Sequence, residues 1–286
     1  MADFGQFRGF SDKLFEGQLP KELGVIGRQR AAQDPDYKQV LEYAISQGYT
    51  LPSFEQQLLQ EQLIVDLKDA GVWSKLDTFS VFATDGDINF ALIDWVRLTD
   101  YTAINSPTFT TNKGFNSDGT SSYIETNYNL LIDSVNYQQN DAGVFTFLTE
   151  YSSSANRGLY TALNTTNYLS TRNDVNRFWT NGGSYLTLQF FSNSNEQIFF
   201  SNRVSSTEIN GRVTSFAAES TNEGSLSTNA TAMIDDDLAL LLRRQSSLYY
   251  LNSECIMGMF ALGSQLNTSE MEDVENIWYN NYFLNL

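Results

Sequence analysis

The pattern of apolar and polar positions divides the chain into a helical first part and a strand-rich second part. Across residues 34–80, apolar residues recur every three or four positions, as on one face of an amphipathic helix. From about Leu76 the pattern becomes alternating, in short runs separated by clusters of Asn, Ser, Gly and Asp. All four prolines lie at or before Pro107, as expected if the remainder forms sheets whose ladders need every N–H group. The pattern therefore predicts helices followed by a β-sandwich or barrel.

Two helices are predicted in the first part. The first begins with the N-cap and N1 pair Asp34-Pro35 and ends at Gly48. The second begins at Ser53, where Gln56 completes a capping-box pattern, and it ends at Gly71. Its apolar stripe could be the seam of an oligomer or could pack on the sandwich, and we favour packing. The stripe consists of Leu58, Leu59, Leu63 and Leu67.

The strand-rich part closes with a buried-looking strand and an acidic amphipathic helix. Residues 256–263 read IMGMFALG, and a helix is predicted near Ser269–Phe283, with Ser269 and Glu272 as its capping box. Asn210-Gly211 is a strong type I′ hairpin signal between two candidate strands. The candidate strands are Phe79–Ala83, Tyr123–Thr126, Val144–Tyr151, Leu159–Ala162, Asn176–Thr180, Tyr185–Phe191, Gln197–Asn202, Thr207–Ile209, Arg212–Ala218, Ala239–Arg243, Tyr249–Leu251 and Ile256–Leu262.

Charge and composition exclude several classes of function. A net charge of −17 disfavours binding to nucleic-acid phosphates and to anionic membrane surfaces. The sequence has no histidine, which removes Ser-His-Asp and Cys-His catalysis and the commonest metal ligand. The one cysteine, Cys255, allows no intrachain disulfide, and its apolar neighbours predict a buried thiol. No apolar run reaches the roughly 18 residues of a membrane span. The first residues lack the layout of a signal peptide, so we expect synthesis in a cytoplasm.

Five motifs occur in order along residues 63–286. They are Leu63–Leu76 (LIVDLKDAGVWSKL), Phe79–Trp95, Asn105–Thr126, the pair Asn202-Arg203 with Ile209–Gly211, and Ala261–Glu272. The ordered set resembles the concanavalin A-like (laminin-G-like) jelly-roll domains that tailed phages carry on their virions. The resemblance implies a mainly β fold, an antiparallel jelly-roll sandwich with an N-terminal helical segment and a C-terminal helix. It also implies a structural or host-adhesion role on a virion.

Three regions are expected on this interpretation. Residues 1–30 form a virion-anchoring or oligomerisation segment, residues 31–78 a helical connector, and residues 79–286 the jelly roll. The first region is apolar but irregular, so it either folds back on its own domain or docks on another virion protein, in the capsid or tail, or on further copies of this chain. Because phage fibres are commonly trimeric, the resemblance implies a homo-oligomer, most simply a trimer. The expected anchoring residues are Phe4, Phe7, Phe10, Leu14, Phe15 and Leu19.

Acidic clusters in the sequence permit catalytic or metal chemistry, but simpler interpretations account for them. Glu270, Glu272 and Glu275 imitate the spacing of a glucanase carboxylate motif, but acidic residues belong in the first turn of a helix, so we expect no enzyme. Asp85-Gly86-Asp87 and Asp235–Asp237 could hold calcium through their oxygens. Both are interpreted as turns or solvated loops, so no metal and no cofactor is expected.

A sugar site is not assigned from the sequence. Residues of a suitable type are common throughout a sandwich rich in Tyr and Asn, and Trp73, Trp95 and Trp278 are interpreted as packing residues. The expected function is a non-enzymatic component of a bacteriophage virion (head fibre, tail fibre or decoration protein). The alternatives are a carbohydrate-binding adhesin for host surface polysaccharide and, third, a glycan hydrolase. The residues suited to sugar binding are Trp179, Tyr185, Tyr168, Asn181 and Asn195.

Overall fold

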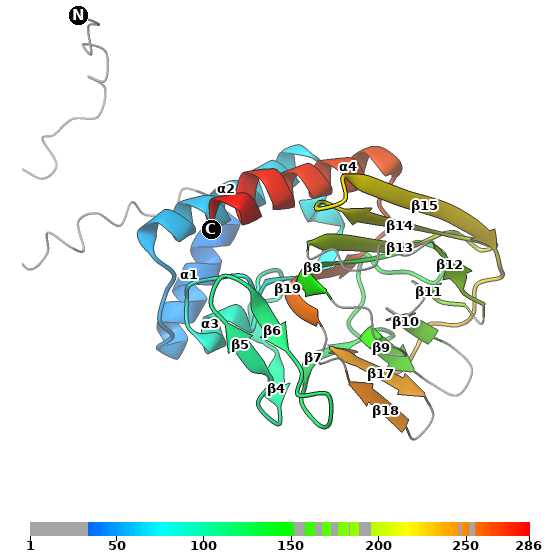
Figure 1. Cartoon of the computed structure of the whole chain (residues 1–286), viewed down its shortest axis with the longest axis horizontal. Helices are drawn as coiled ribbons and strands as arrows, with labels where there is room; N and C mark the ends of the chain where they lie inside the picture. The colour runs from blue at the N-terminus through cyan, green and yellow to red at the C-terminus, as the bar shows by residue number, and fades with distance from the viewer. Residues whose placement is uncertain are drawn as a thin grey trace, which may run out of the picture.

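A computed structural model describes residues 34–151, 158–163, 168–172, 177–182, 184–188, 196–245, 248–251 and 255–286. Within these residues the chain forms three layers: a smaller sheet, a larger sheet, and helices that cover the larger sheet (Figure 1). Both sheets are antiparallel, and helices lie before and after the strands. The predicted fold class, a mainly β concanavalin A-like sandwich with N-terminal helices and a C-terminal helix, is confirmed.

Capping residues set the ends of the helices. Asp34 caps α1 by accepting backbone hydrogen bonds from Asp36 and Tyr37, and Gly48 ends the helix with a φ of 76°. Ser53 caps α2, but the Gln56 side chain turns to Thr84 instead of completing a capping box. The helices are α1 (Pro35–Gln47), α2 (Phe54–Asp69), η4 (Trp73–Lys75), α3 (Ile88–Ala91), α4 (Thr268–Asn276), its π-helical continuation η5 (Ile277–Tyr282) and η6 (Phe283–Asn285).

The larger sheet forms the middle layer. Its strands run in the order β15-β14-β13-β8-β19-β6-β5, with β1 beside the second half of β19. Strands β8, β13 and β19 are buried on both faces, which explains why their sequences are apolar almost throughout. The strands are β1 (Leu76–Val81), β5 (Thr108–Thr110), β6 (Gly114–Asn116), β8 (Ala142–Tyr151), β13 (Gln197–Ser205), β14 (Glu208–Ser215), β15 (Ser220–Ser227) and β19 (Cys255–Gly263).

The smaller sheet faces the larger one, and two short hairpins stand beside the sandwich. The order in the smaller sheet is β12-β11-β10-β9-β16-β7-β4. Its strands are β4 (Thr102–Ile104), β7 (Tyr123–Asn129), β9 (Gly158–Leu163), β10 (Tyr168–Arg172), β11 (Arg177–Trp179), β12 (Leu186–Thr187) and β16 (Asp237–Leu240). The hairpins pair β2 (Ile93–Asp94) with β3 (Thr99–Asp100), and β17 (Leu242–Gln245) with β18 (Leu248–Leu251).

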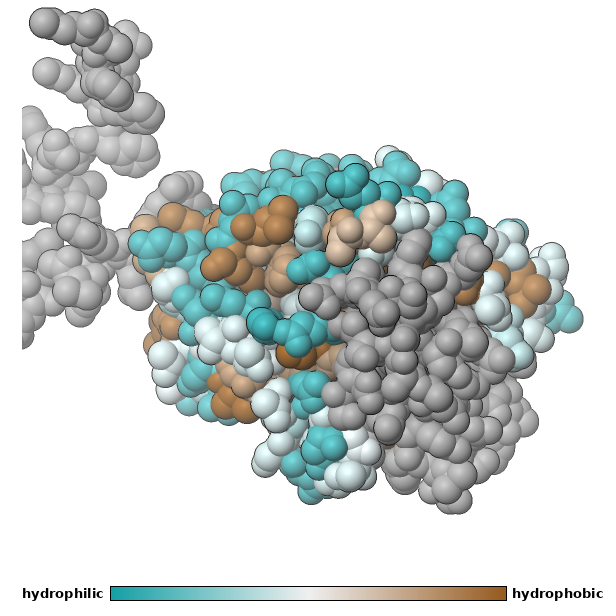
Figure 2. Space-filling view, in the orientation of Figure 1, coloured by the Kyte–Doolittle hydropathy of each residue, from teal (hydrophilic) through white to brown (hydrophobic). Residues whose placement is uncertain are grey.

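Two hydrophobic cores lie on opposite faces of the larger sheet. Along β8, Val144 and Leu148 point into the core between the sheets, whereas Phe145 and Phe147 point into the core beneath the helices. The second core also contains Val40 of α1 and further residues of α2, α4 and η5. The outer surface of the helical layer is mostly hydrophilic (Figure 2). No helix in the described ranges is both long and apolar enough to cross a membrane.

The Asn210-Gly211 hairpin prediction is wrong. Both residues lie inside β14, which pairs along its length with β13 and β15, and the chain turns instead between Ser205 and Glu208. Ile209 and Val213 both enter the core between the sheets, which requires a continuous strand across the dipeptide. Pairing on both edges and burial of one face therefore override the local turn preference.

Two further boundary predictions are corrected. The capping box of α4 is Asn267 with Glu270, two residues before the predicted Ser269 and Glu272, because Asn267 has the extended backbone that an N-cap needs. The predicted strand Ala239–Arg243 is split into β16 and β17 at Leu241, whose φ is 61°. Strands β2 to β6, β10 and β15 were not predicted.

The leucine stripe of α2 packs on the molecule, as favoured from the sequence. Leu63 and Leu67 are buried in the helix-side core with Ile64, while Leu58 is exposed. The helices and the sandwich share this core. The proposed division at residues 30 and 78 stays a prediction.

Candidate functional site

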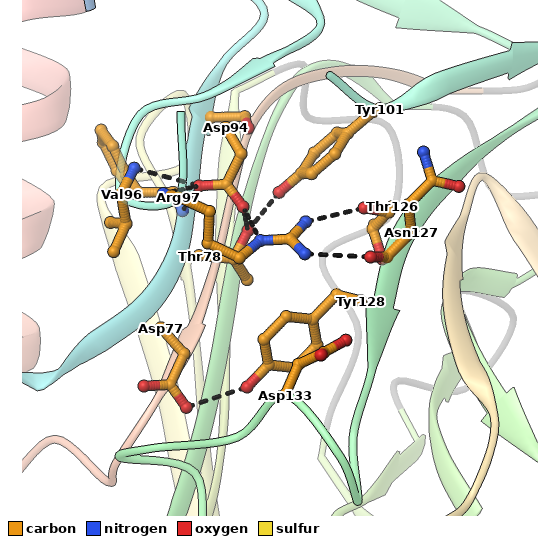
Figure 3. Close-up of polar contacts among 12 residues, drawn as sticks. Asp77, Thr78, Asp94, Val96, Arg97, Tyr101, Thr126, Asn127, Tyr128 and Asp133 are labelled. Atoms are coloured by element: carbon orange, nitrogen blue, oxygen red, sulfur yellow. Dashed lines mark hydrogen bonds and ion pairs between the residues drawn. The ribbon is translucent and has the colours of Figure 1, made fainter. Parts of the chain in front are cut away.

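A buried polar network joins the first strand to the hairpin that follows it. Asp94, at the end of β2, is fully buried and accepts hydrogen bonds from Thr78 Oγ1 (2.6 Å) and from the backbone N–H of Val96 (3.0 Å). Its carboxylate also pairs with Arg97 Nε at 2.6 Å (Figure 3). Asp94 therefore fixes the Trp95–Leu98 turn from beneath.

Arg97 connects this turn to the smaller sheet. Its Nη1 and Nη2 atoms donate to the carbonyl oxygens of Asn127 (2.9 Å) and Thr126 (2.8 Å) on β7. The guanidinium carbon lies 5.0 Å from the centre of the Tyr128 ring, a cation–π contact (Figure 3). Burial opposes the charge, but Asp94 outweighs burial and raises the pKa of Arg97. The cation is thus held permanently between the two elements.

Asp77, the residue before Thr78 on β1, also holds a loop in place through its carboxylate. Its carboxylate accepts backbone hydrogen bonds from Val135 (3.0 Å), Asn136 (2.8 Å) and Tyr137 (2.8 Å), and the hydroxyl of Tyr128 donates to it at 2.9 Å. Burial, with the neighbouring Asp77 charge, raises the pKa of Tyr128, so the phenol keeps its proton. Asp77 therefore holds the loop after β7 against β1.

This network positions backbone and is not itself a reaction centre. Asp94 is completely buried and Asp77 is 6% exposed, and both carboxylates are occupied by donors from the protein. A catalytic carboxylate must reach a substrate proton or carbon. The chemical result of the network is a rigid Trp95–Leu98 turn at the surface.

That turn forms one side of a cavity of about 200 Å³, which we call the tryptophan pocket. Two of its residues come from α1, one from η4 and three from the turn. Its lining comprises Asp36, Gln39, Trp73, Trp95, Val96 and Leu98.

Both indoles in the tryptophan pocket have fixed positions. Trp95 is 2% exposed, and its ring lies 5.7 Å from Tyr37 and 5.8 Å from Phe79 between ring centres. Trp73 is half-buried, and its Nε1 donates to Asp36 Oδ2 at 3.0 Å. Trp95 Nε1, in contrast, has no hydrogen-bond partner within the described ranges. The pocket thus combines aromatic surface with carboxylate and amide groups.

Asp36 at the rim shares the ammonium of Lys68 with Asp34. The same Oδ2 atom that accepts from Trp73 lies 2.6 Å from Lys68 Nζ. Lys68 also pairs with Asp34, and these two carboxylates raise the pKa of Lys68 although burial acts in the opposite direction. Two carboxylates thus share one ammonium, so the rim stays net negative and offers acceptor oxygens.

A second, open groove of about 300 Å³ lies between β14, β15 and the start of α4. Its charged members, Glu208 and Glu223, are both acidic. Glu223 lies 3.0 Å from Arg212, whose guanidinium is also bound by Glu275 of α4 at 2.8 Å. The other lining residues are Asn210, Gly211, Gly224, Ser225, Thr268 and Met271.

The three glutamates considered for catalysis have different structural environments. Glu270 completes the cap of α4 and pairs with Lys75, whereas Glu275 binds Arg212. Glu272 is 58% exposed and lies 3.6 Å from Arg212. Glu272 and Glu275 therefore share the guanidinium of Arg212, whereas Glu270 pairs with Lys75, so each of the three carboxylates is engaged by a cation of the protein.

Three of the candidate calcium residues accept hydrogen bonds from groups of the protein. Asp87 caps α3 through the N–H groups of Asn89 and Phe90, and Asp85 accepts from the N–H of Ser53. Asp235 accepts from the Asn129 side chain at 3.1 Å. In the part of the chain that the structure describes, no group of three or more acidic or cysteine residues is arranged to hold a metal ion.

Of the five residues considered for sugar binding, the structure describes the side chains of Tyr185 and Asn181. Tyr185 is exposed, whereas Asn181 is fully buried and accepts a hydrogen bond from Tyr137. The side chains of Tyr168 and Trp179, and all of Asn195, lie outside what the structure describes. The predicted anchoring residues Phe4, Phe7, Phe10, Leu14, Phe15 and Leu19 also lie outside the described residues.

Sequence reasoning missed the network and the pocket for different reasons. Asp77 and Asp94 each interrupt an apolar run, LDTFSVF and ALIDWV, and a charge inside a buried strand could have marked them. Trp95 and Trp278 are buried, as interpreted from the sequence. Trp73 lines a cavity together with Asp36 and Gln39 of α1, and no local sequence pattern predicts that these residues lie together.

Comparisons with known proteins identify no family. No family model and no curated protein matches the chain. Domain 4 of AbnA, a GH43 extracellular arabinanase from Geobacillus stearothermophilus, is similar with a TM-score of 0.46 and 12% identity, over 70% of this chain and 98% of that one. Trypanosoma rangeli sialidase in complex with sialic acid is similar with a TM-score of 0.48 and 11% identity, over 79% of this chain and 40% of that one.

The enzymatically active domain of bacteriophage CBA120 tailspike protein 2 is also similar in part. Its TM-score is 0.42 and its identity 6%, over 62% of this chain and 30% of that one. This chain thus spans less than half of the sialidase and tailspike chains. At these TM-scores the likenesses do not bear on what this chain does.

Proposed function

We propose that this chain is a non-enzymatic structural component of a bacteriophage virion, a head fibre, tail fibre or decoration protein. Residues 1–30 anchor it to the capsid or tail, and the lectin-like sandwich projects outward. The proposal rests on the five ordered motifs of residues 63–286. It is supported by the fold class, because jelly rolls recur in viral capsid and lectin domains.

The shared helix-side core is the observation that carries the projecting arrangement. Val40 of α1, Leu63 of α2 and Phe145 of β8 are buried in that core together. A force or contact applied at the start of α1 is therefore transmitted to the sandwich through packed side chains. A rigid body of this kind suits a component that must hold a domain away from the particle surface.

Deletion of residues 1–30 tests the anchor. We expect the shortened protein to be soluble with an unchanged β-rich circular dichroism spectrum, and to be missing from phage particles produced with it. The measurement is the amount of this protein per purified particle, by immunoblot. Normal incorporation of a folded deletion variant contradicts the proposed anchor.

We further propose that the protein is a homo-oligomer, most simply a trimer. Exposed apolar side chains on the loop after β7 support contact with further copies, since Leu131, Ile132 and Val135 are 50%, 73% and 76% exposed. Sedimentation equilibrium of the full chain tests the oligomer. Ile132→Asp and the deletion of residues 1–30 then separate the two contact regions, and a wild-type monomer at micromolar concentration contradicts the proposal.

Recognition of host surface polysaccharide is the second candidate function. The observation that favours it is the tryptophan pocket, which places two indoles beside carboxylate and amide groups. A glycan array probed with the purified full chain tests this function separately from incorporation into particles.

A further inference from the structure

We propose that the tryptophan pocket binds a single uncharged sugar residue, at the end of or within a polysaccharide. This assignment develops the second candidate function and does not depend on the virion role. It places the binding site at the junction of α1, η4 and the β2–β3 turn, away from both faces of the smaller sheet.

The size and rigidity of the pocket favour a ligand of one ring. Its volume is about 200 Å³, which is below the roughly 300–1,000 Å³ of sites that enclose drug-sized molecules. Tyr37 and Phe79 hold the Trp95 ring, and Asp94 holds the turn that carries it. The site is therefore formed before any ligand arrives, which reduces the entropy lost on binding.

The walls of the pocket match the apolar face of a pyranose ring. Trp73 is half-buried, and its ring meets Phe79 edge-on at an interplanar angle of 77°, which fixes the plane of the indole. Val96 and Leu98 add aliphatic surface on the side of the turn. A sugar ring presents C–H groups on one face, and these pack on flat aromatic and aliphatic surface.

The polar groups of the pocket match hydroxyl groups, which both donate and accept. Asp36 and Gln39 offer acceptor oxygens, and the Gln39 amide also offers N–H donors. A sugar with several hydroxyls uses both kinds of group.

Other ligand classes use the pocket less completely. A cation would suit two indoles and a carboxylate, but Lys68 Nζ already lies 2.6 Å from Asp36, and a cation offers no acceptor to the Gln39 amide. An anion meets Asp34 and Asp36, which share one Lys68, in a chain with a net charge of −17. A proline-rich peptide offers carbonyl acceptors to the Gln39 amide but few N–H donors to Asp36, because proline has none. The neutral, hydroxyl-rich ligand is the one that engages every side of the pocket.

The experiment uses the full chain in two stages. A glycan array of bacterial surface polysaccharides first identifies binding saccharides. Isothermal titration then measures affinity for the methyl glycosides of the sugar residues shared by the binders, with tetramethylammonium chloride as a cation probe. The variants are Trp73→Ala, Trp73→Phe and Gln39→Ala, and the control is Tyr185→Ala. Tyr185 is an exposed aromatic just before β12, the edge strand of the smaller sheet, and does not line the pocket.

We expect Trp73→Ala to weaken binding about tenfold or more, as loss of a central aromatic contact does in other interfaces. Trp73→Phe should restore part of the affinity, because it returns an aromatic face without the indole nitrogen. Gln39→Ala changes an exposed side chain, so it should weaken binding while leaving thermal unfolding unaltered. Tyr185→Ala should bind as the wild type does.

Three outcomes overturn the assignment. The first is the absence of any array saccharide that binds the wild type. The second is binding that both Trp73→Ala and Gln39→Ala leave unchanged, which places the sugar elsewhere. The third is a response to tetramethylammonium chloride without a response to any glycoside, which makes the pocket a cation site. None of these outcomes affects the deletion test of the virion anchor.

Discussion

At the residue scale, caps and buried charges follow from chemistry that is partly visible in the sequence. The prediction that Asp34 is the N-cap of α1 is confirmed. Asp is favoured at an N-cap, and proline is favoured at the first helical position that follows it. Arg203 was noted only as part of a motif, yet it is completely buried. Its acceptors are carbonyl oxygens from residues far along the chain, and no local pattern identifies such partners.

Asp34 is expected to stabilise the protein in a pH-dependent way. Burial opposes its charge, but hydrogen bonds from Lys68 and from the N–H of Tyr37 outweigh burial and lower its pKa below 3.8. A lowered folded-state pKa contributes stability above the unfolded-state pKa, and the contribution disappears as the pH falls through the folded-state pKa. Asp34→Ala should reduce the free energy of unfolding by about 0.5–2 kcal/mol near neutral pH.

Urea unfolding of Asp34→Ala and Asp34→Asn, at about pH 7 and about pH 3, checks this prediction. Asn retains the cap but loses the charge, so Asp34→Asn should lose less stability than Asp34→Ala at neutral pH. The difference between wild type and Asp34→Asn should shrink at the lower pH. A difference that grows on acidification contradicts the assigned sign.

Arg203→Lys is expected to be strongly destabilising although the charge is kept. The guanidinium donates through Nε and Nη2 to the carbonyl of Thr180 (3.0 and 2.8 Å) and through Nη1 to that of Thr228 (2.7 Å). A lysine ammonium cannot span these acceptors. The expected loss is at least about 2 kcal/mol in the free energy of unfolding, measured with urea. Lys38→Ala, in an exposed pair with Glu42, is the control and should stay within about 0.5 kcal/mol of wild type.

At the element scale, packing decided the cases in which local signals failed. Asn210-Gly211 has the composition of a turn but lies in β14, since Ile209 and Val213 must both reach the core. Strand β15 has the sequence STNEGSLS, which lacks the alternating apolar residues that would predict a strand. It forms because its backbone pairs with β14 along its whole length. In contrast, β8 and β19 were predicted because burial on both faces leaves continuous apolar runs.

The contact between β14 and α4 supplies a prediction at this scale. Arg212 binds both carboxylate oxygens of Glu275 (2.8 and 3.1 Å), and Thr214 donates to the same carboxylate at 2.6 Å. Glu275→Gln leaves the nearly buried guanidinium without its main counter-charge and should cost about 2–4 kcal/mol in urea unfolding. Glu272→Gln, three residues earlier in α4 at an exposed position, should change stability by less than about 0.5 kcal/mol. Equal effects of the two substitutions contradict this account of the interface.

At the scale of the whole molecule, the sequence predicted the layers better than their connections. Strand alternation and the absence of proline after Pro107 indicated a sandwich, and the leucine stripe of the second helix was expected to pack on it. The tryptophan pocket was not predictable, because it brings α1 together with a turn about 60 residues later in the chain. Such a site depends on the tertiary arrangement and not on the spacing of neighbouring residues.

The sharing of the middle sheet by both cores predicts cooperative unfolding of the described fold. Phe145 and Phe147 of β8 pack under the helices, while Val144 and Leu148 of the same strand pack between the sheets. The helices therefore cannot leave without exposing a face of the sheet that holds the sandwich core, and the two parts should unfold as one unit. Helical ellipticity and the amide hydrogen exchange of β7 and β16 in the smaller sheet should give coincident urea transitions with equal midpoints. A helical signal that disappears first, with the protection of β7 and β16 preserved, would instead support a separate connector covering residues 31–78.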